Sequence, residues 1–323
     1  MLQRCDNRPD GHSIRALVRD RGPLPCLNRS TGRLNTPLPW GDPTARQVPL
    51  FIRWEDYSDY LPADLRGVRF VQIGANCGKN TYGCAVGGDP IWSYATMCGW
   101  HGIAIEPVSY TFAKLCRNYL RWPHVTPARG AVADKPGTAF MKLSHGEGNK
   151  LLSDQERHGP TVPGSQGPRR RIKNESVPQL SLTSLWAQRR TIMAEAELRG
   201  SKDAAGFVAT GAKSHGVRQV GIRSADVVDI LAIDAEGAEG LILGGADPLP
   251  HPRPSLILFE HVHLPPSEQT GIDDKLRREG YTRLTDLRNK DPRGSHMPPA
   301  NRLYGLQHLA VRTNHRESAT HRR

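Results

Sequence analysis

The chain has 323 residues, which is enough for one large domain or two modest ones, and a formal net charge of +12. Its apolar content of 37% is low for a compact domain of this length, whereas 26 prolines and 32 glycines are many. We therefore expect one domain of the size of a typical catalytic domain, with additional segments that lack regular secondary structure.

The positive charge invites a nucleic-acid-binding interpretation, but its distribution along the sequence does not favour one. Basic residues gather at 168–171, 189–190 and 313–323, without the interleaved aromatic residues that base-stacking surfaces use. Solvated arginines on loops and tails are the simpler interpretation, so no nucleic-acid partner is expected. No apolar run is long enough to form a membrane-spanning helix, and no membrane span is expected either.

The six cysteines show no CxxC spacing, so a zinc site is not expected. The N-terminus lacks an apolar signal core, which favours reduced thiols and a cytoplasmic location. The arginine-rich first fifty residues leave an organelle address open, although acidic residues interrupt the transit-peptide pattern. The sequons at Asn28 and Asn174 carry no weight without a secretory signal, and the oligomeric state is not indicated.

Residues 1–65 mix proline, arginine and aspartate, which predicts an irregular N-terminal extension. Only 51–54 and 57–61 are apolar enough to dock on a domain. From residue 68, predicted strands alternate with predicted helices. We expect strands at 68–73, 102–105, 125–132, 138–143, 177–182, 227–233, 255–259, 281–287 and 303–311. We expect helices within 80–98, at 110–120, from 183, near 193–198, at 238–243 and at 273–279.

This alternation, with apolar runs too continuous for a half-exposed sheet, predicts an α/β fold with a mostly parallel sheet and an antiparallel C-terminal strand pair. We assign residues 66–312 to one domain, with loop insertions near 144–176 and 187–225 and a basic tail at 313–323. The first insertion is interpreted as a mobile lid over the ligand edge, with a surface insertion of no role as an equal alternative.

The turn after the first strand is the most informative feature of the sequence. Gly74 and Gly78 allow backbone conformations closed to other residues and the close approach of a ligand, and the next helix start offers unpaired N–H groups. The GxGxxG and P-loop patterns are missing, which argues against a dinucleotide or a triphosphate. Glu106, at the end of the second strand, suits a ribose diol. S-adenosylmethionine (SAM) has a ribose but no phosphate, and it fits these features.

Polar residues follow several of the predicted strands directly. In an open α/β sheet, ligands bind at the edge formed by the carboxyl ends of the strands. We therefore expect these residues to converge on one site. They are Asn76, Glu106, Asp134, Asp234 and Glu260.

Three blocks, Val71–Gly78, Ile105–Pro107 and Val228–Glu239, resemble the signature blocks of FkbM-type methyltransferases. The resemblance covers roughly residues 68–263. It implies a Rossmann-like class I methyltransferase fold and a SAM-dependent enzyme that usually acts on oxygen. The chain departs from the family at Gln72, where an acid is common, and at Ala232, where a lysine is often found.

The cofactor-binding candidates are the residues of the glycine turn and the acids after the second and third strands. The Gln72 carbonyl oxygen suits the cofactor's ammonium group, Glu106 the ribose and Asp134 the adenine amino group. Asn76 and Asp134 are explained as well by turn formation. The full set is Gln72, Gly74, Asn76, Gly78, Glu106 and Asp134.

Asp234, Glu236 and His261 are the catalytic candidates, as acceptors for the proton of a substrate hydroxyl that attacks the methyl carbon. Glu239 is explained by the start of a helix. No metal is assigned, although Glu260, His261 and His263 would complete a metal site with Asp234. The sequence thus predicts O-methylation of a small molecule or glycan. A non-catalytic binding protein with this fold is the alternative, and a nucleic-acid methyltransferase ranks third because an Asn/Asp-Pro-Pro-Tyr motif is missing.

Overall fold

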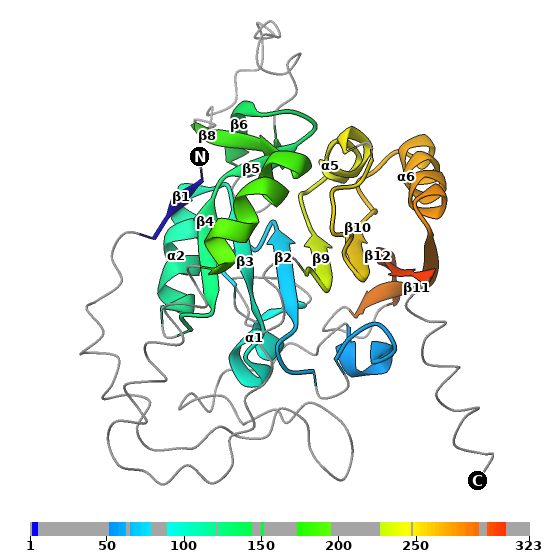
Figure 1. Ribbon diagram of the computed structural model, residues 1–323. Coiled ribbons are helices and arrows are strands. Elements are labelled where there is room, and N and C mark those ends of the chain that lie inside the picture. Colours follow the sequence, from blue (N-terminus) through cyan, green and yellow to red (C-terminus); the bar gives the residue numbers. More distant parts are fainter. Residues whose placement is uncertain are drawn as a thin grey trace, which may run out of the picture.

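The computed structural model describes residues 2–5, 52–62, 65–78, 89–120, 122–143, 150–151, 173–194, 227–246, 248–290 and 296–307. They form a large mixed sheet, a small second sheet and flanking helices (Figure 1). The large sheet contains β1 (Gln3–Arg4), β2 (Arg69–Ile73), β3 (His101–Glu106), β4 (Val125–Arg129), β9 (Ile230–Ile233), β10 (Leu256–Glu260), β11 (Tyr281–Lys290) and β12 (His296–Leu306). The small sheet contains β5 (Ala131–Ala133), β6 (Gly137–Leu143), β7 (Lys150–Leu151) and β8 (Lys173–Ser181).

The large sheet has the strand order β1-β4-β3-β2-β9-β10-β12-β11. Strands β4, β3, β2, β9 and β10 are parallel neighbours, whereas β12 runs antiparallel to both β10 and β11. The predicted α/β fold, its mostly parallel sheet and its antiparallel C-terminal pair are therefore confirmed. No helix in the described ranges is long and apolar enough to cross a membrane.

Helices cover both faces of the sheet, because the strands are apolar on both. On one face, Phe70 and Ala104 pack with α1 (Trp92–Cys98), α2 (Ser109–Tyr119) and the docked 3₁₀ turn Trp54–Tyr57. The opposite face of the same strands packs against the helix at 182–194, α5 (Glu239–Gly245) and α6 (Pro266–Arg278). Figure 1 shows α2 at one end of this arrangement and α5 and α6 toward the other.

The expected single strand at 125–132 is wrong. The chain leaves the large sheet after β4, and β5 pairs instead with β8 in the small sheet. Gly130 separates the two strands, and a Cβ atom there would lie 2.3 Å from Leu2 Cδ2. A residue from the far N-terminus therefore packs closely against this position, which the local sequence did not reveal.

Three expected irregular segments contain regular structure. Within 144–176, β7 and the first residues of β8 pair with β6, so the predicted loop is wrong at those positions. The helix that starts at 182 continues to 194, inside the insertion expected at 187–225. Within 1–65, β1 pairs with β4, and the predicted docking of 51–54 and 57–61 is confirmed by buried Ile52, Trp54 and Leu61. The remainder of these segments and the tail at 313–323 lie outside the described residues.

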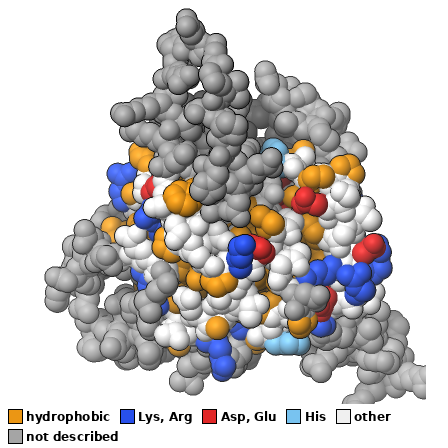
Figure 2. Space-filling model, turned by 90° about the horizontal axis from the view of Figure 1, so that it is seen from above, with side chains coloured by type: hydrophobic (Ala, Val, Ile, Leu, Met, Phe, Trp, Pro, Cys, Tyr) orange, Lys and Arg blue, Asp and Glu red, His pale blue; other side chains and the backbone are white. Residues whose placement is uncertain are grey.

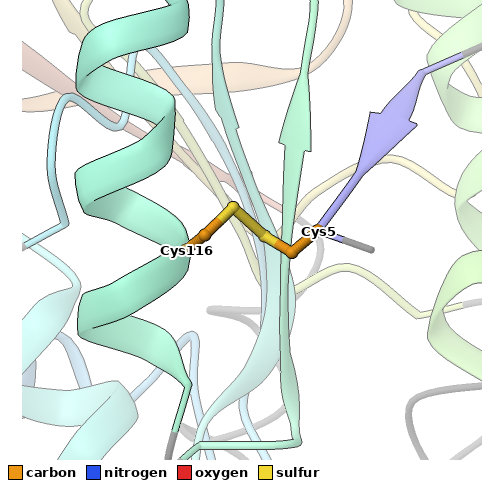
Figure 3. Close-up of a disulfide and its surroundings, with 2 residues drawn as sticks. All are labelled: Cys5 and Cys116. Carbon is orange, nitrogen blue, oxygen red and sulfur yellow. A yellow bond between two sulfur atoms is a disulfide. The ribbon is translucent and has the colours of Figure 1, made fainter. Parts of the chain in front are cut away.

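The expectation of reduced thiols is wrong for the described cysteines. Cys5, directly after β1, forms a disulfide with Cys116 in α2 across 111 residues of sequence (Figure 3). Cys77 and Cys98 are also disulfide-bonded, and no described cysteine is free. Sequence spacing did not predict the pair, because the pairing of β1 with β4 brings the two residues together.

The first glycine of the turn after β2 is fixed by backbone contact with β9. Gly74 has φ +76°, and a Cβ atom there would lie 1.6 Å from the carbonyl oxygen of Asp234. Its N–H donates to the carbonyl oxygen of Ile105 at 3.0 Å, while the Asp234 N–H donates to that of Ile73 at 2.9 Å. The turn therefore closes on the ends of both neighbouring strands.

We expect the double variant Cys5→Ser/Cys116→Ser to lose about 4 kcal/mol of unfolding free energy, because a cross-link over ~100 residues removes that much loop entropy from the unfolded chain. Urea denaturation of both proteins under non-reducing conditions measures the loss. A double variant with the wild-type unfolding midpoint would contradict a stabilising role.

We expect Gly74→Ala to be destabilised by roughly 3 kcal/mol or more, because strain at positive φ adds to the backbone clash. Gly99→Ala is the matched control, since Gly99 has φ +66° and no atom lies within 4 Å of the position that its Cβ would take. The control should cost only about 1–2 kcal/mol. Equal losses in the two variants, measured by thermal unfolding, would rule out the contact with Asp234 as the cause.

Candidate functional site

The carboxyl ends of four adjacent parallel strands form one edge with polar residues along it. Asn76 follows β2, Glu106 ends β3, Asp234 follows β9 and Glu260 ends β10. The chain runs from β2 through β3 to β4 on one side and then returns to β9 on the other side of β2. Such a reversal of strand order is the point at which open α/β sheets bind ligands.

Glu106 joins the glycine turn to the start of α2. Its side chain is buried, with Oε2 accepting a hydrogen bond from Asn76 N–H at 3.0 Å and Oε1 accepting one from Val108 N–H at 2.9 Å. Burial raises the pKa of Glu106 to about 7, and the charges of Asp234 and Glu175 add to the rise. A carboxylate has four lone-pair positions, so two remain for the hydroxyl groups of a ligand.

Asn76 is a turn residue, as its sequence context predicted. It has φ +50°, a left-handed conformation that asparagine tolerates, and its side-chain oxygen accepts a hydrogen bond from Cys77 N–H at 2.8 Å. Gly78 is held by packing, because a Cβ atom there would lie 2.4 Å from both the Leu115 and the Tyr119 side chains. The turn is therefore rigid before any ligand arrives.

Asp134 lies apart from the parallel strand ends. It is exposed and follows β5 of the small sheet, and a Cβ atom on Gly245 of α5 would lie 2.5 Å from the Asp134 Cα atom. The start of this bend thus packs closely against α5, while the proposed contact of Asp134 with adenine stays a prediction.

Three carboxylates and one imidazole meet beyond β9 and β10. His263 Nε2 lies 3.6 Å from an oxygen of Glu236 and 3.6 Å from an oxygen of Glu260. The carboxyl groups of Asp234 and Glu260 share a hydrogen bond. Desolvation raises the pKa of Glu260, and the charges of Asp234, Glu236 and Glu239 raise it further. Burial by the surrounding protein and the charge of Glu236 also raise the pKa of Asp234. The Asp234 side chain nevertheless keeps contact with solvent.

His263 is the imidazole beside these carboxylates, whereas the sequence analysis selected His261 as the base. His261 is half-buried directly after β10, and its carbonyl oxygen accepts hydrogen bonds from Leu264 N–H and from the Gln269 amide, each at 3.1 Å. The His-x-His spacing after a strand end was the available signal for His263, which was considered only as a metal ligand.

Glu239 organises the turn that carries Glu236. It is fully buried in the first turn of α5, and its oxygens accept hydrogen bonds from Ala235 N–H at 2.6 Å and Gly237 N–H at 3.0 Å. Burial raises the pKa of Glu239 to about 7. These bonds brace the turn in which Glu236 has φ +52°, while the role of Glu239 at the helix start stays a prediction.

Two overlapping groups of side chains have the spacing that a metal ion requires. The ligand atoms of Glu236, Glu260 and His263 lie within 4.8 Å of one another, as do those of Asp234, Glu239 and Glu260. Glu239 already accepts two backbone hydrogen bonds, so the group with His263 has the freer oxygens.

Gln72 lies on β2 with its side chain toward α1 and is buried. Its Nε2 donates to Asp89 Oδ2 at 3.2 Å, whereas its Oε1 has no hydrogen-bond partner. Asp89 was missed, because it lies within 80–98, where the sequence analysis considered only helices. An aspartate just before a helix start is a capping signal, and Asp89 Oδ1 indeed accepts from Ile91 and Trp92 N–H, each at 2.7 Å.

The comparisons with known proteins agree with the fold and with the resemblance seen in the sequence. The family model described as "Methyltransferase FkbM domain" matches residues 72–283. No curated protein matched the sequence.

Solved structures show weaker likeness. A methyltransferase FkbM from Methylobacillus flagellatus is 11% identical with a TM-score of 0.37, and the alignment covers 77% of this chain and 47% of that one. The catalytic domain of hMettl16 in complex with MAT2A 3'UTR hairpin 6 is 16% identical with a TM-score of 0.33, covering 94% and 87%. A human methyltransferase 10 domain containing protein is 14% identical with a TM-score of 0.32, covering 92% and 97%.

The chain thus spans about half of the first of these proteins, and scores this low add no argument of their own. The family match contains β3, β4, β9 and β10 in full and the last two residues of β2, so it covers the polar edge. This chain belongs to the FkbM methyltransferase family and has its Rossmann-like class I fold.

Proposed function

We propose that this chain transfers a methyl group from SAM to a hydroxyl oxygen of a small molecule or glycan. The observation that carries the proposal is Glu106, a buried carboxylate at the point where the strand order reverses, with oxygens directed at two backbone N–H groups and further lone pairs available. A ribose diol offers two hydroxyl donors to such a group, and SAM carries a ribose without a phosphate.

The residues at the edge fit the remainder of SAM. The unpartnered Gln72 Oε1 is an acceptor for the ammonium group, and the rigid turn at 74–78 fixes the backbone beside it. When bound, SAM supplies a methyl group activated by a sulfonium. The protein therefore needs mainly to align the acceptor hydroxyl and, for a weakly acidic alcohol, to accept its proton.

Asp234 and Glu236 are the proton acceptors we favour, with His261 retained as the third candidate. Both carboxylates follow β9, the direct neighbour of β2, and both are exposed enough to meet a substrate. Burial and then the charge of Glu236 raise the pKa of Asp234, which makes it a stronger base than an ordinary aspartate. His263 joins the candidates because it lies 3.6 Å from Glu236. The mechanism requires no metal.

The alternative is a non-catalytic binding protein that retains the methyltransferase fold. Gln72 and Ala232 motivate it, since both replace charged residues that are common in the family. A nucleic-acid acceptor ranks lower. On the face seen in Figure 2, the described lysine and arginine side chains lie at several separate places among acidic and apolar ones. A polynucleotide backbone is bound by a continuous basic groove.

We also infer that the protein matures in an oxidising compartment and not in the cytoplasm. The Cys5–Cys116 disulfide and the bonded Cys77 and Cys98 support this inference, because cytosolic proteins rarely keep such bonds. Such a compartment favours a glycan acceptor over a cytoplasmic metabolite. Thiol labelling of the protein isolated from its own cells decides the matter, and a labelled Cys116 would contradict the inference.

Removing the proton acceptor should slow methyl transfer by roughly 10²- to 10⁴-fold at saturating SAM. The measurement follows radiolabelled methyl transfer to glycans and small molecules extracted from the source cells, for Asp234→Asn, Glu236→Gln, His261→Gln and His263→Gln. Asp274→Asn, an exposed acid on α6, is the control. Turnover at the wild-type level in all four variants would eliminate this assignment, and no SAM binding at millimolar concentration would favour the non-catalytic alternative.

Binding of S-adenosylhomocysteine should tighten with rising pH. The pKa of Glu106 is raised to about 7, so its charged form, the better acceptor for ribose hydroxyls, becomes dominant above that pH. Between pH 6 and pH 8 the dissociation constant should fall about tenfold in calorimetry, because the charged fraction of Glu106 rises by about that factor. In Glu106→Gln this dependence should disappear. A variant that folds and keeps the full pH dependence would assign it to another group.

A further inference from the structure

The two departures from the family sequence lie directly opposite each other in the sheet. Gln72 of β2 pairs with Ala232 of β9 and, on its other side, with Ala104 of β3. The two alanines belong to the apolar cluster on the face covered by α1 and α2. An acid at 72 and a lysine at 232 would therefore be cross-strand neighbours, and here both charges are missing together.

This paired replacement leaves a polar group without a partner. The Gln72 side chain is 4% exposed, and alanines on both sides offer it no hydrogen bond. Its Nε2 is satisfied by Asp89, but its Oε1 has no partner. Unpaired buried acceptors are rare in native proteins because they cost free energy, so this oxygen calls for an explanation.

Asp89 brings a carboxyl group to the same place from another element. It is 3% exposed, and burial raises its pKa. Its Oδ1 accepts the hydrogen bonds at the start of α1, while among the described residues Oδ2 has only the Gln72 amide as a partner. Within the part of the chain that the structure describes, no lysine or arginine forms an ion pair with it. Nearby, the fully buried Tyr119 hydroxyl feels the charge of Asp89 and also has no hydrogen-bond partner.

We propose that Asp89 and Gln72 together bind the ammonium group of the amino-acid tail of SAM. Gln72 Oε1 accepts one of its hydrogen bonds, and the Asp89 carboxylate supplies the charge that the family takes from an acid at position 72. The absence of a lysine at 232 is part of the same arrangement, because it leaves this negative charge uncompensated until the ammonium arrives. The inference rests on the proposed use of SAM.

The test compares S-adenosylhomocysteine with its analogue in which hydrogen replaces the α-amino group. Calorimetry at pH 8 should give the wild type a roughly 10- to 100-fold preference for the amino compound, as expected for a charge-assisted hydrogen bond. In Asp89→Asn the preference should shrink to a few-fold. Asparagine keeps an oxygen for Ile91 and Trp92 N–H, so α1 retains its start. Asp274→Asn, at an exposed position, should keep the full preference.

The outcomes separate this inference from the proposed function. A wild type that binds neither compound would overturn the use of SAM itself. A wild type with the preference, together with Asp89→Asn that keeps it, would overturn the role of Asp89. Gln72→Met guards against misfolding of the first variant, because it removes Oε1 and the Nε2 bond to Asp89 but leaves the Asp89 Oδ1 bonds at the start of α1 in place. It should lose several-fold of the preference while thermal unfolding reports a folded protein, and an unchanged preference would also count against the proposal.

Discussion

The contact between the Gly74 backbone and the Asp234 carbonyl oxygen sets the geometry of the whole polar edge. It holds the end of β2 against the end of β9, at the point where the chain reverses its direction across the sheet. A side chain at residue 74 would separate the two strand ends, and with them Glu106 on one side and Asp234 on the other. The SAM-binding half of the proposed site, with Glu106, and the substrate half, with Asp234, thus meet through backbone atoms.

Several carboxylates lie close together at this edge, which costs free energy because they lose hydration and repel one another. Glu106 and Glu239 are buried acids that brace two turns through backbone N–H groups, and their raised pKa values reflect lost hydration. Asp234, Glu236 and Glu260 stand closer to solvent with His263 among them. Both inner acids therefore brace the turns at this edge, and Glu106 also keeps lone pairs for the ribose in the proposed function, whereas the outer acids are free to accept a proton.

The local sequence pattern was sufficient to predict the central strands. It was insufficient wherever contacts between residues distant in sequence determine the structure. The apolar runs before Gly74 and Glu106 predicted the bounds of β2 and β3 within one or two residues, because a parallel strand buried on both faces is a nearly continuous apolar run. The break at Gly130 reflects the pairing of β5 with β8 in the small sheet, and the Cys5–Cys116 pair depends on β1 joining β4, so neither was visible locally. Asp89 was hidden for a related reason, because its partner Gln72 lies on another element. The candidate site was located from strand ends, but its internal contacts needed the tertiary structure.

The disulfide between Cys5 and Cys116 also gives the chain a covalent ring. Gln72, Gly74, Asp89 and Glu106 all belong to that ring, whereas Asp234 and Glu260 lie in the open part of the chain beyond it. A single peptide-bond break within the ring leaves these four residues, the SAM-binding side of the proposed site, attached to the same molecule. A break between residues 117 and 233 would instead divide the SAM-binding side from the side with Asp234 and Glu260, leaving only non-covalent contacts to join them. The two halves of the proposed site therefore differ in covalent topology.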